Sequence, residues 1–261
     1  MPMMTMSDGC AIHYRIDGED SLPVLMFSNS LGSSLEMWEL QADKLADHFR
    51  ILRYDNRGHG ASDVPGGPYT IERIALDAKE LIEGLGLPPV HFCGLSLGGM
   101  VGLWLGANAP GLLARAVLAN TSSYIGQPEI WAQRIALVEK EGMNAAASGI
   151  VQRWVTRDFV ESDPIATAKL LAMVAGIPPA GYIAAAEAVK AMDLRSVLPK
   201  IEIPILVIAG AHDPATPPAM AEAIVEAVAN ARLAILDAAH LSNIERPDEF
   251  NALLINFLGT A

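Results

Sequence analysis

The chain has 261 residues, of which 51% are hydrophobic and 18% are charged. This composition excludes an intrinsically disordered chain, which combines low hydrophobicity with a high density of charge. The net charge of −12 argues against binding to nucleic acid or to an anionic membrane surface, because both need clustered lysines and arginines. An anionic small molecule would need its own local cation.

The cysteines and the apolar segments indicate the cellular compartment of the protein. Cys10 and Cys93 are too few for a disulfide framework or for the paired ligands of a zinc site, which favours a cytoplasmic protein. The first ten residues lack a positive region followed by a long apolar stretch, so we expect no secretory signal. Residues 84–114 contain no Asp, Glu, Lys or Arg, but prolines and glycines interrupt them, whereas a membrane helix needs about 20 uninterrupted apolar residues. We therefore expect no membrane association, and the sequence does not indicate an oligomeric state.

Short apolar runs alternate with helical patterns in the first part of the chain. Strands are predicted at 25–27, 49–54, 90–93 and 116–119, and helices at 70–85 and 97–108. This alternation is typical of parallel strands joined by crossover helices. Strands that are nearly continuously apolar, rather than alternating, indicate a sheet that helices cover on both faces.

The middle of the chain has a different character. Residues 122–199 show little strand signal and many alanines, with glycines and prolines at intervals, which predicts an all-helical insertion. Strands are predicted again at 205–208 and 233–236, with helices at 217–228 and 247–258. We therefore predict one core domain made of residues 1–121 and 200–261, interrupted by a helical cap over residues 122–199.

One motif between a predicted strand and a predicted helix carries chemistry. The segment Gly94-Leu95-Ser96-Leu97-Gly98 fits G-x-S-x-G, in which the serine occupies a tight, strained turn. Glycines are needed there because side chains would collide with neighbouring backbone. The turn lifts the Ser96 hydroxyl above the sheet and aims the Leu97 N–H toward a developing oxyanion. Ser96 is the candidate nucleophile; the alternative is a glycine-rich turn with an incidental serine.

A serine hydroxyl is a weak nucleophile at neutral pH, so it needs a base and a group that orients the base. Asp213 follows the strand predicted at 205–208, and His240 follows the one predicted at 233–236. The order Ser96, Asp213, His240 is the Ser…Asp/Glu…His order of the α/β-hydrolases. These residues at three strand ends predict a catalytic triad.

Other residues compete for two of these roles. His212 could be the base, but it is adjacent to Asp213, and neighbouring side chains rarely face each other well enough for a triad bond. Asp237 could orient the base, although it lies only three residues before His240. We expect His59, in the loop at 57–60, to be structural.

Over essentially its whole length the chain resembles the α/β-hydrolase superfamily. The pattern Asp55-x-Arg57-Gly58-x-Gly60-x-Ser62 is similar to the family's loop after its fourth strand, and Glu245-x-Pro247 with Phe250 resembles its C-terminal pattern. The resemblance implies an α/β fold with a mostly parallel eight-stranded sheet, helices on both faces and a helical cap over the active site. Ser28-Asn29 occupies the place of the family's His-Gly pair, which puts Ser30 where the second oxyanion N–H would be.

Four segments fill variable positions of the general pattern and resemble the 3-oxoadipate enol-lactonases. They are residues 27–32, 94–100, 212–218 and 240–243. The resemblance implies hydrolysis of a cyclic enol ester to 3-oxoadipate, in the β-ketoadipate pathway of aromatic-compound degradation. It implies a small anionic lactone as the partner, a serine acyl-enzyme, and no metal or organic cofactor.

The carboxymethyl arm of such a lactone calls for a cation in the pocket. We favour Arg134, because Trp131 lies three residues before it on a predicted helix, where both can line one face. Trp131 would pack against the lactone ring, and Arg134 would bind the carboxylate. The alternative is that both are ordinary packing or surface residues. The second choice is Trp154 with Arg153 or Arg157, whereas Arg57 is expected to hold its loop.

Other hydrolases on the same scaffold are the nearest alternatives, because fold alone does not settle chemistry. They are a broad carboxylesterase, a C–C bond hydrolase and a cofactor-free perhydrolase. Ser96 argues against haloalkane dehalogenases and epoxide hydrolases, which use a carboxylate at that position. From a different class, the chain could be a ligand-binding receptor that turns over slowly.

Overall fold

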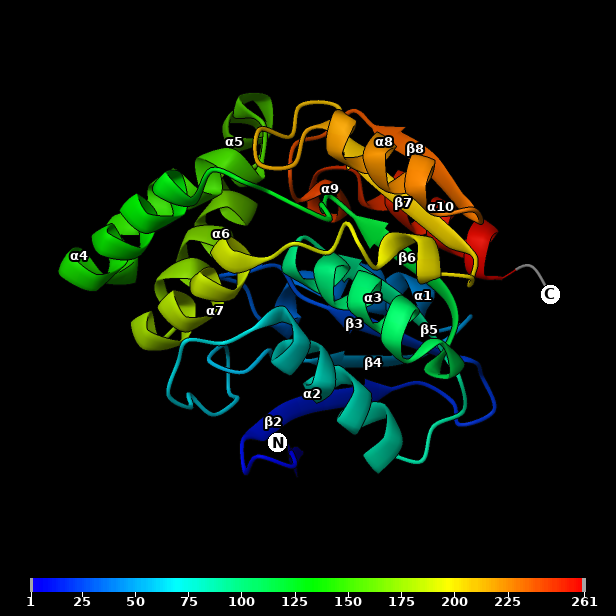
Figure 1. Ribbon diagram of the computed structural model, residues 1–261. Helices are drawn as coiled ribbons and strands as arrows, with labels where there is room; N and C mark the ends of the chain where they lie inside the picture. The colour runs from blue at the N-terminus through cyan, green and yellow to red at the C-terminus, as the bar shows by residue number, and fades with distance from the viewer. Residues whose placement is uncertain (1, 260–261) are drawn as a thin grey trace.

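The computed structural model describes residues 2–259, and an eight-stranded sheet runs through the centre of this part of the chain (Figure 1). The strand order is β1-β2-β4-β3-β5-β6-β7-β8. Strand β2 pairs antiparallel with β1 and β4, and the pairs from β4 to β8 are parallel. The predicted mostly parallel, eight-stranded α/β-hydrolase fold is confirmed.

The strands are β1 (Met3–Thr5), β2 (Ala11–Asp17), β3 (Val24–Ser28), β4 (Arg50–Tyr54), β5 (Val90–Leu95), β6 (Leu113–Ala119), β7 (Ile205–Gly210) and β8 (Ala231–Leu236). All six strands predicted from apolar runs overlap β3 to β8. The runs did not reveal β1 and β2, because these strands lie at one side of the sheet and expose part of their length. Strands that are not buried on both faces lack a continuous apolar sequence.

Helices cover both faces of the sheet (Figure 1). Helices α2 (Ile71–Gly84), α3 (Leu97–Asn108) and α8 (Pro218–Ala227) lie on one face, and α1 (Glu39–Leu45) and α10 (Pro247–Leu258) on the other. The four helices predicted in these regions are confirmed within a residue or two at each end, whereas α1 was not predicted. Short helical turns complete the core: η1 (Leu35–Trp38), η2 (Pro110–Leu112), η3 (Leu198–Lys200) and α9 (Ser242–Glu245).

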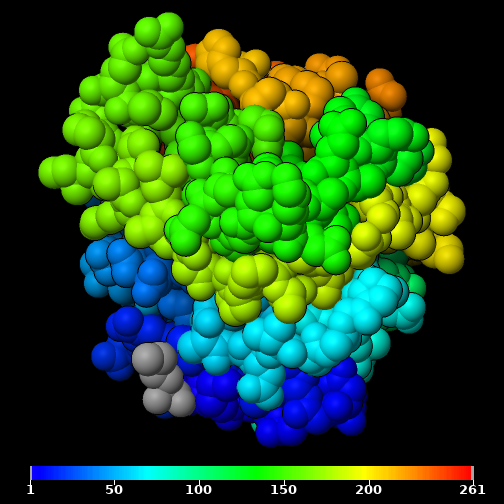
Figure 2. All heavy atoms as spheres, turned by 90° about the vertical axis from the view of Figure 1, so that its left-hand side faces the viewer, coloured from blue at the N-terminus to red at the C-terminus, as the bar shows by residue number. Residues whose placement is uncertain are grey.

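The cap helices, defined here as α4 to α7, lie in the chain between β6 and β7. They are α4 (Pro128–Trp154), α5 (Arg157–Ser162), α6 (Pro164–Ala175) and α7 (Pro179–Ala191). Figure 2 shows them, in green and yellow-green, across the middle of one face of the molecule. The two connections between cap and core meet at an antiparallel bridge between Tyr124 and Asp193. The predicted limits of the insertion, 122–199, enclose these helices.

Large apolar side chains fill the space between the sheet and its helices. The Trp38 ring stacks on Phe27 of β3, with ring centroids 4.5 Å apart, and it also packs against Phe250 of α10. Within residues 2–259 no single helix is both long and apolar enough to span a bilayer. Helices α6 and α7 pass that test only as a pair, and the chain bends by 92° between them.

Candidate active site

Ser96 lies in the tight turn between β5 and α3. Its φ of 56° and ψ of −112° place it in the region that non-glycine residues rarely adopt, a kind of strain that clusters at functional sites. A Cβ atom at Gly94 would collide with the carbonyl oxygen of Gly98, and one at Gly98 with the carbonyl oxygen of Ser28. The glycines are therefore required by close backbone approach, as the sequence predicted.

Asp213 and His240 lie together beyond the carboxyl ends of β7 and β8. His240 Nδ1 is 2.8 Å from Asp213 Oδ2, and both side chains are buried. Asp213 Oδ1 accepts hydrogen bonds from the N–H groups of Ala215 and Thr216, at 2.8 and 3.0 Å, and Oδ2 accepts one from Thr216 Oγ1 at 2.7 Å. The loop thus fixes the orientation of the Asp213 carboxylate independently of its hydrogen bond to the imidazole.

These bonds have an electrostatic consequence. Burial is the largest influence on Asp213 and raises its pKa, but the charge of His240 and the hydrogen bonds from His240 and Thr216 outweigh burial. The pKa of Asp213 therefore lies below its ordinary value. Asp213 is ionised near neutral pH, as a group that orients an imidazole must be.

Asn120 is a site residue that the sequence analysis missed. Its side-chain amide donates to Asp213 Oδ2 at 3.0 Å and to the carbonyl of Ala239 at 3.0 Å, and its oxygen accepts from Ser242 at 2.6 Å. Its φ of 46° is left-handed, which Asn tolerates better than most residues. Asn120 directly follows β6, so the reasoning that identified Asp213 and His240 at strand ends would have found it as well.

Ser96 and His240 line one cavity of about 270 Å³ beneath the cap. They make no hydrogen bond with each other, although Nδ1 of the His240 ring is held by Asp213, which leaves Nε2 for other partners. Catalytic hydrogen bonds are often long in unliganded enzymes and tighten when substrate binds. The structure therefore brings the three predicted triad residues to one site.

Trp131 and Arg134 both line this cavity from helix α4. The Arg134 guanidinium lies 4.6 Å from the centre of the Trp131 ring, so the two side chains share one face of the helix as predicted. Tyr182 lines the cavity as well; burial raises its pKa, and the charge of Arg134 opposes that effect.

Arg153 and Trp154 also line the cavity. Burial lowers the pKa of Arg153, and the positive charge of Arg134 lowers it further. Within residues 2–259 neither arginine forms an ion pair, and no acidic side chain lines the cavity. Arg157, the other candidate cation, is exposed and pairs with Glu161 at 2.8 Å, so it does not reach this cavity.

The two predicted oxyanion donors differ in their surroundings. The Leu97 N–H is the first of helix α3 and has no partner within the helix. The Ser30 N–H donates to Met37 Sδ at 3.4 Å, and Met37 does not line the cavity. Ser30 and the next residue, Leu31, both line the cavity, and the Leu31 N–H has no hydrogen-bond partner in the described part of the chain.

The competing residues have other partners. His212 Nε2 and Asp237 Oδ1 pair with each other at 2.8 Å on the surface, away from Ser96. His59 is buried and accepts a hydrogen bond from the Gly32 N–H at 3.1 Å. Arg57 forms two 2.6 Å hydrogen bonds to Asp77, which ties its loop to α2.

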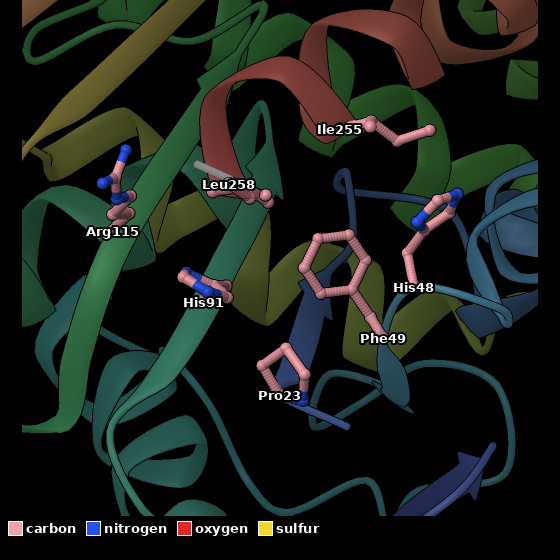
Figure 3. A pocket seen from close by; sticks show the side chains of 8 residues that line it. Pro23, His48, Phe49, His91, Arg115, Ile255 and Leu258 are labelled. Carbon is pink, nitrogen blue, oxygen red and sulfur yellow. The ribbon is translucent and has the colours of Figure 1, made fainter. Parts of the chain in front are cut away.

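A second cavity of about 480 Å³ lies at the opposite, amino-terminal ends of the parallel strands (Figure 3). Its lining includes His48, Phe49, His91 and Arg115, with the Phe49 ring edge-on to His91 at 5.8 Å. None of the predicted catalytic residues lines it. Ligands of open α/β sheets bind at the carboxyl ends of the strands, which favours the smaller cavity as the active site.

Comparison with known proteins agrees with the fold. The chain is 39% identical over 241 residues to 3-oxoadipate enol-lactonase 2 of Acinetobacter baylyi, covering 92% of this chain and 90% of that protein. It is 32% identical over 262 residues to RutD of Agrobacterium fabrum, a protein named as a candidate carbamate hydrolase, covering 95% of this chain and 96% of that protein.

A solved structure is similar over the whole chain. The crystal structure of the enol-lactonase from Burkholderia xenovorans superimposes with a TM-score of 0.97 at 42% identity, covering 99% of this chain and 100% of that chain. The model of the alpha/beta hydrolase family matches residues 25–253, which is most of the chain. The chain therefore belongs to the alpha/beta hydrolase family and is an enzyme that hydrolyses an ester or a lactone.

Proposed function

We propose that this enzyme opens 3-oxoadipate enol-lactone to 3-oxoadipate, a step of the β-ketoadipate pathway of aromatic-compound degradation. The observation that carries the substrate class is the cavity beside Ser96, which has two guanidinium groups and no acidic side chain in a protein with a net charge of −12. Such a cavity favours a small anionic substrate. The relatives named as enol-lactonases support the lactone itself.

In the first half of the proposed reaction, Ser96 attacks the lactone carbonyl while His240 Nε2 takes the serine proton. Asp213 holds the imidazole in the tautomer with hydrogen on Nδ1, so that Nε2 is free to accept. The tetrahedral intermediate carries its negative charge on the former carbonyl oxygen. Backbone N–H groups aimed at such an oxygen contribute about 3 to 4 kcal/mol each in comparable sites.

We assign those N–H groups to Leu97 and Leu31. The Leu97 N–H opens helix α3, whose positive end faces the nucleophile. For the second donor we replace Ser30, the expectation from the sequence, by Leu31. Both residues line the cavity, but the Ser30 N–H already has Met37 Sδ as its acceptor, whereas the Leu31 N–H has no partner among residues 2–259.

In the second half of the reaction, the C–O bond to the enol oxygen breaks and His240 returns its proton to that oxygen. The leaving group stays attached to the acyl chain on Ser96 and tautomerises to the ketone. Water then gives a proton to His240 and attacks the acyl carbonyl. The bond between the acyl carbon and Ser96 Oγ breaks and His240 returns the proton to Oγ, which releases 3-oxoadipate and restores the Ser96 hydroxyl.

Trp131, Arg134 and Arg153 are proposed to bind the substrate. The Trp131 ring is a flat wall for the lactone, and Arg134, stacked on that ring, is placed to meet the carboxymethyl group. Arg153 supplies a second positive charge in the same cavity. Burial and the charge of Arg134 both lower the pKa of Arg153 in the free enzyme, and a carboxylate between the two guanidinium groups relieves the second effect, their mutual repulsion.

The test compares initial rates on 3-oxoadipate enol-lactone and on neutral 4-nitrophenyl acetate. A charge-assisted hydrogen bond contributes about 1.5 to 3 kcal/mol, so the lactone should exceed the acetate in kcat/KM by roughly 10- to 150-fold. Comparable or higher kcat/KM on the acetate would overturn the lactonase proposal and support a broad carboxylesterase. A carbamate substrate assayed in parallel tests the reaction named for the RutD relative.

A further inference from the structure

The histidine loop, defined here as Ala239, His240 and Leu241, is bound to the cap on both sides of His240. On one side, the Leu241 N–H donates to the carbonyl oxygen of Trp154, at the end of helix α4, at 2.7 Å. On the other side, the Ala239 N–H donates to Glu245 Oε2 at 2.6 Å. The other oxygen of Glu245 accepts hydrogen bonds from the cap.

Glu245 Oε1 accepts two hydrogen bonds from Thr156, one from the hydroxyl at 2.6 Å and one from the N–H at 3.1 Å. Thr156 is the residue that precedes helix α5, and its hydroxyl oxygen also accepts from the Phe159 N–H at 3.2 Å. Among residues 2–259 Glu245 forms no ion pair, and its carboxylate accepts hydrogen bonds from the histidine loop and from the cap.

This set of bonds joins the cavity wall to the base. Trp154 lines the cavity and its carbonyl holds Leu241, while Thr156 lies outside the cavity lining and holds Ala239 through Glu245. Ala239, His240 and Leu241 are buried, so the loop has little freedom apart from these partners. Asp213 fixes the ring of His240, and the cap fixes its backbone.

We infer that Glu245 and Thr156 are positioning residues for His240, and that the cap is part of the catalytic apparatus as well as its roof. The inference rests on the proposed role of His240 as the base. We therefore expect that loss of a hydrogen bond in the cap lowers kcat even for a substrate that is too small to need the cap for binding. A cap that only bound substrate would leave such a reaction unchanged.

The experiment measures kcat and KM for 4-nitrophenyl acetate and for the enol-lactone in Thr156→Val and Glu245→Gln. Thr156→Val removes the hydroxyl and keeps the shape, whereas Thr156→Ser keeps the hydroxyl. Because a misplacement of about 1 Å can cost ~100-fold, we expect kcat to fall by about tenfold on both substrates in Thr156→Val and Glu245→Gln. KM should stay within about twofold, and Thr156→Ser should restore most of kcat.

Asp163→Ala is the matched control. Asp163 caps the neighbouring cap helix α6 through the Ala166 N–H at 2.9 Å and makes no bond to the histidine loop. It should lower the melting temperature, as loss of a helix cap does, with kcat unchanged. Glu245→Gln leaves the cap of α5 intact, so it tests the inference even if Thr156→Val fails to fold.

Unchanged kcat on 4-nitrophenyl acetate in folded Glu245→Gln and Thr156→Val would overturn the inference, as would an equal loss of kcat in Asp163→Ala. The readout on the acetate is independent of the lactonase proposal. If the wild type hydrolyses the acetate but never the lactone, the positioning role is still decided by the acetate rates, while the proposed substrate fails.

Discussion

Replacing Asp213 by Asn changes the group that accepts five hydrogen bonds around the proposed base. Two backbone N–H groups meet Oδ1, whereas His240, Thr216 and Asn120 meet Oδ2. An amide has only one oxygen. The backbone N–H groups cannot reverse their roles, but the Thr216 hydroxyl and the His240 ring can, so the amide oxygen should stay at Oδ1 and the NH₂ group should face His240.

The magnitude follows from that orientation. To keep a hydrogen bond, His240 must accept at Nδ1 and carry its proton on Nε2, where it can no longer take the proton of Ser96. In a comparable serine triad the Asp-to-Asn change lowers kcat by about 10⁴-fold, or ~5 kcal/mol. The loss of stability should be smaller, about 1.5 to 3 kcal/mol for one charged hydrogen bond, because Asn120 keeps its bond to Ala239.

The assay measures kcat on the lactone and on 4-nitrophenyl acetate, with urea unfolding to measure stability. Asp237→Asn is the matched control, because Asp237 also lies 2.8 Å from a histidine nitrogen but on the surface. It should leave kcat unchanged. If Asp213→Asn kept more than about a tenth of the wild-type kcat, the orienting role assigned to Asp213 would be refuted, because the wrong tautomer should cost far more.

Three further predictions concern the tight turn at Ser96, the cavity and the response to acid. Gly98→Ala places a Cβ against the Ser28 carbonyl, so we expect a loss of more than about 2 kcal/mol of stability or no folded protein, and a wild-type urea midpoint would contradict this packing. Arg134→Met should lower kcat/KM for the anionic lactone by about 10- to 100-fold while changing that for 4-nitrophenyl acetate less than about twofold; equal losses on both substrates would exclude a carboxylate-binding role. Because the pKa of Asp213 lies below its ordinary value, its carboxylate stabilises the folded state above about pH 4 and this contribution is lost as the pH falls through the lowered value. The stability difference between wild type and Asp213→Asn in urea should therefore shrink below about pH 4, and a constant difference would contradict the bonding described for Asp213.

The parts of the fold that the sequence predicts are those whose stability is local or repetitive. A buried parallel strand such as β7 is apolar along its whole length, and α10 repeats apolar residues at helical spacing, so each carries its own signal. Strand β2 and helix α1 carry weaker signals, because the strand is partly exposed and the helix has only seven residues. They form because the neighbouring sheet stabilises them.

The residues of the site also differ in how well the sequence predicts them. Ser96, Asp213 and His240 follow predicted strands, so topology alone brings them to one edge of the sheet. Asn120 satisfies the same rule, but Asn is common in turns and its bonds to Asp213 and Ala239 join residues that are distant in sequence. The proposed choice of Leu31 over Ser30 rests on the contact between the Ser30 N–H and the Met37 sulfur, which the sequence pattern does not reveal.

The most direct test of Ser96 as the nucleophile and of the lactone as the substrate follows the ultraviolet absorbance of 3-oxoadipate enol-lactone after addition of wild-type enzyme or Ser96→Ala. We expect rapid decay with the wild type, and decay at the rate of the enzyme-free solution with Ser96→Ala, which keeps the cavity and its arginines. Equal decay with both proteins would contradict Ser96 as the nucleophile. No decay with a wild type that still hydrolyses 4-nitrophenyl acetate would contradict the lactone as the substrate.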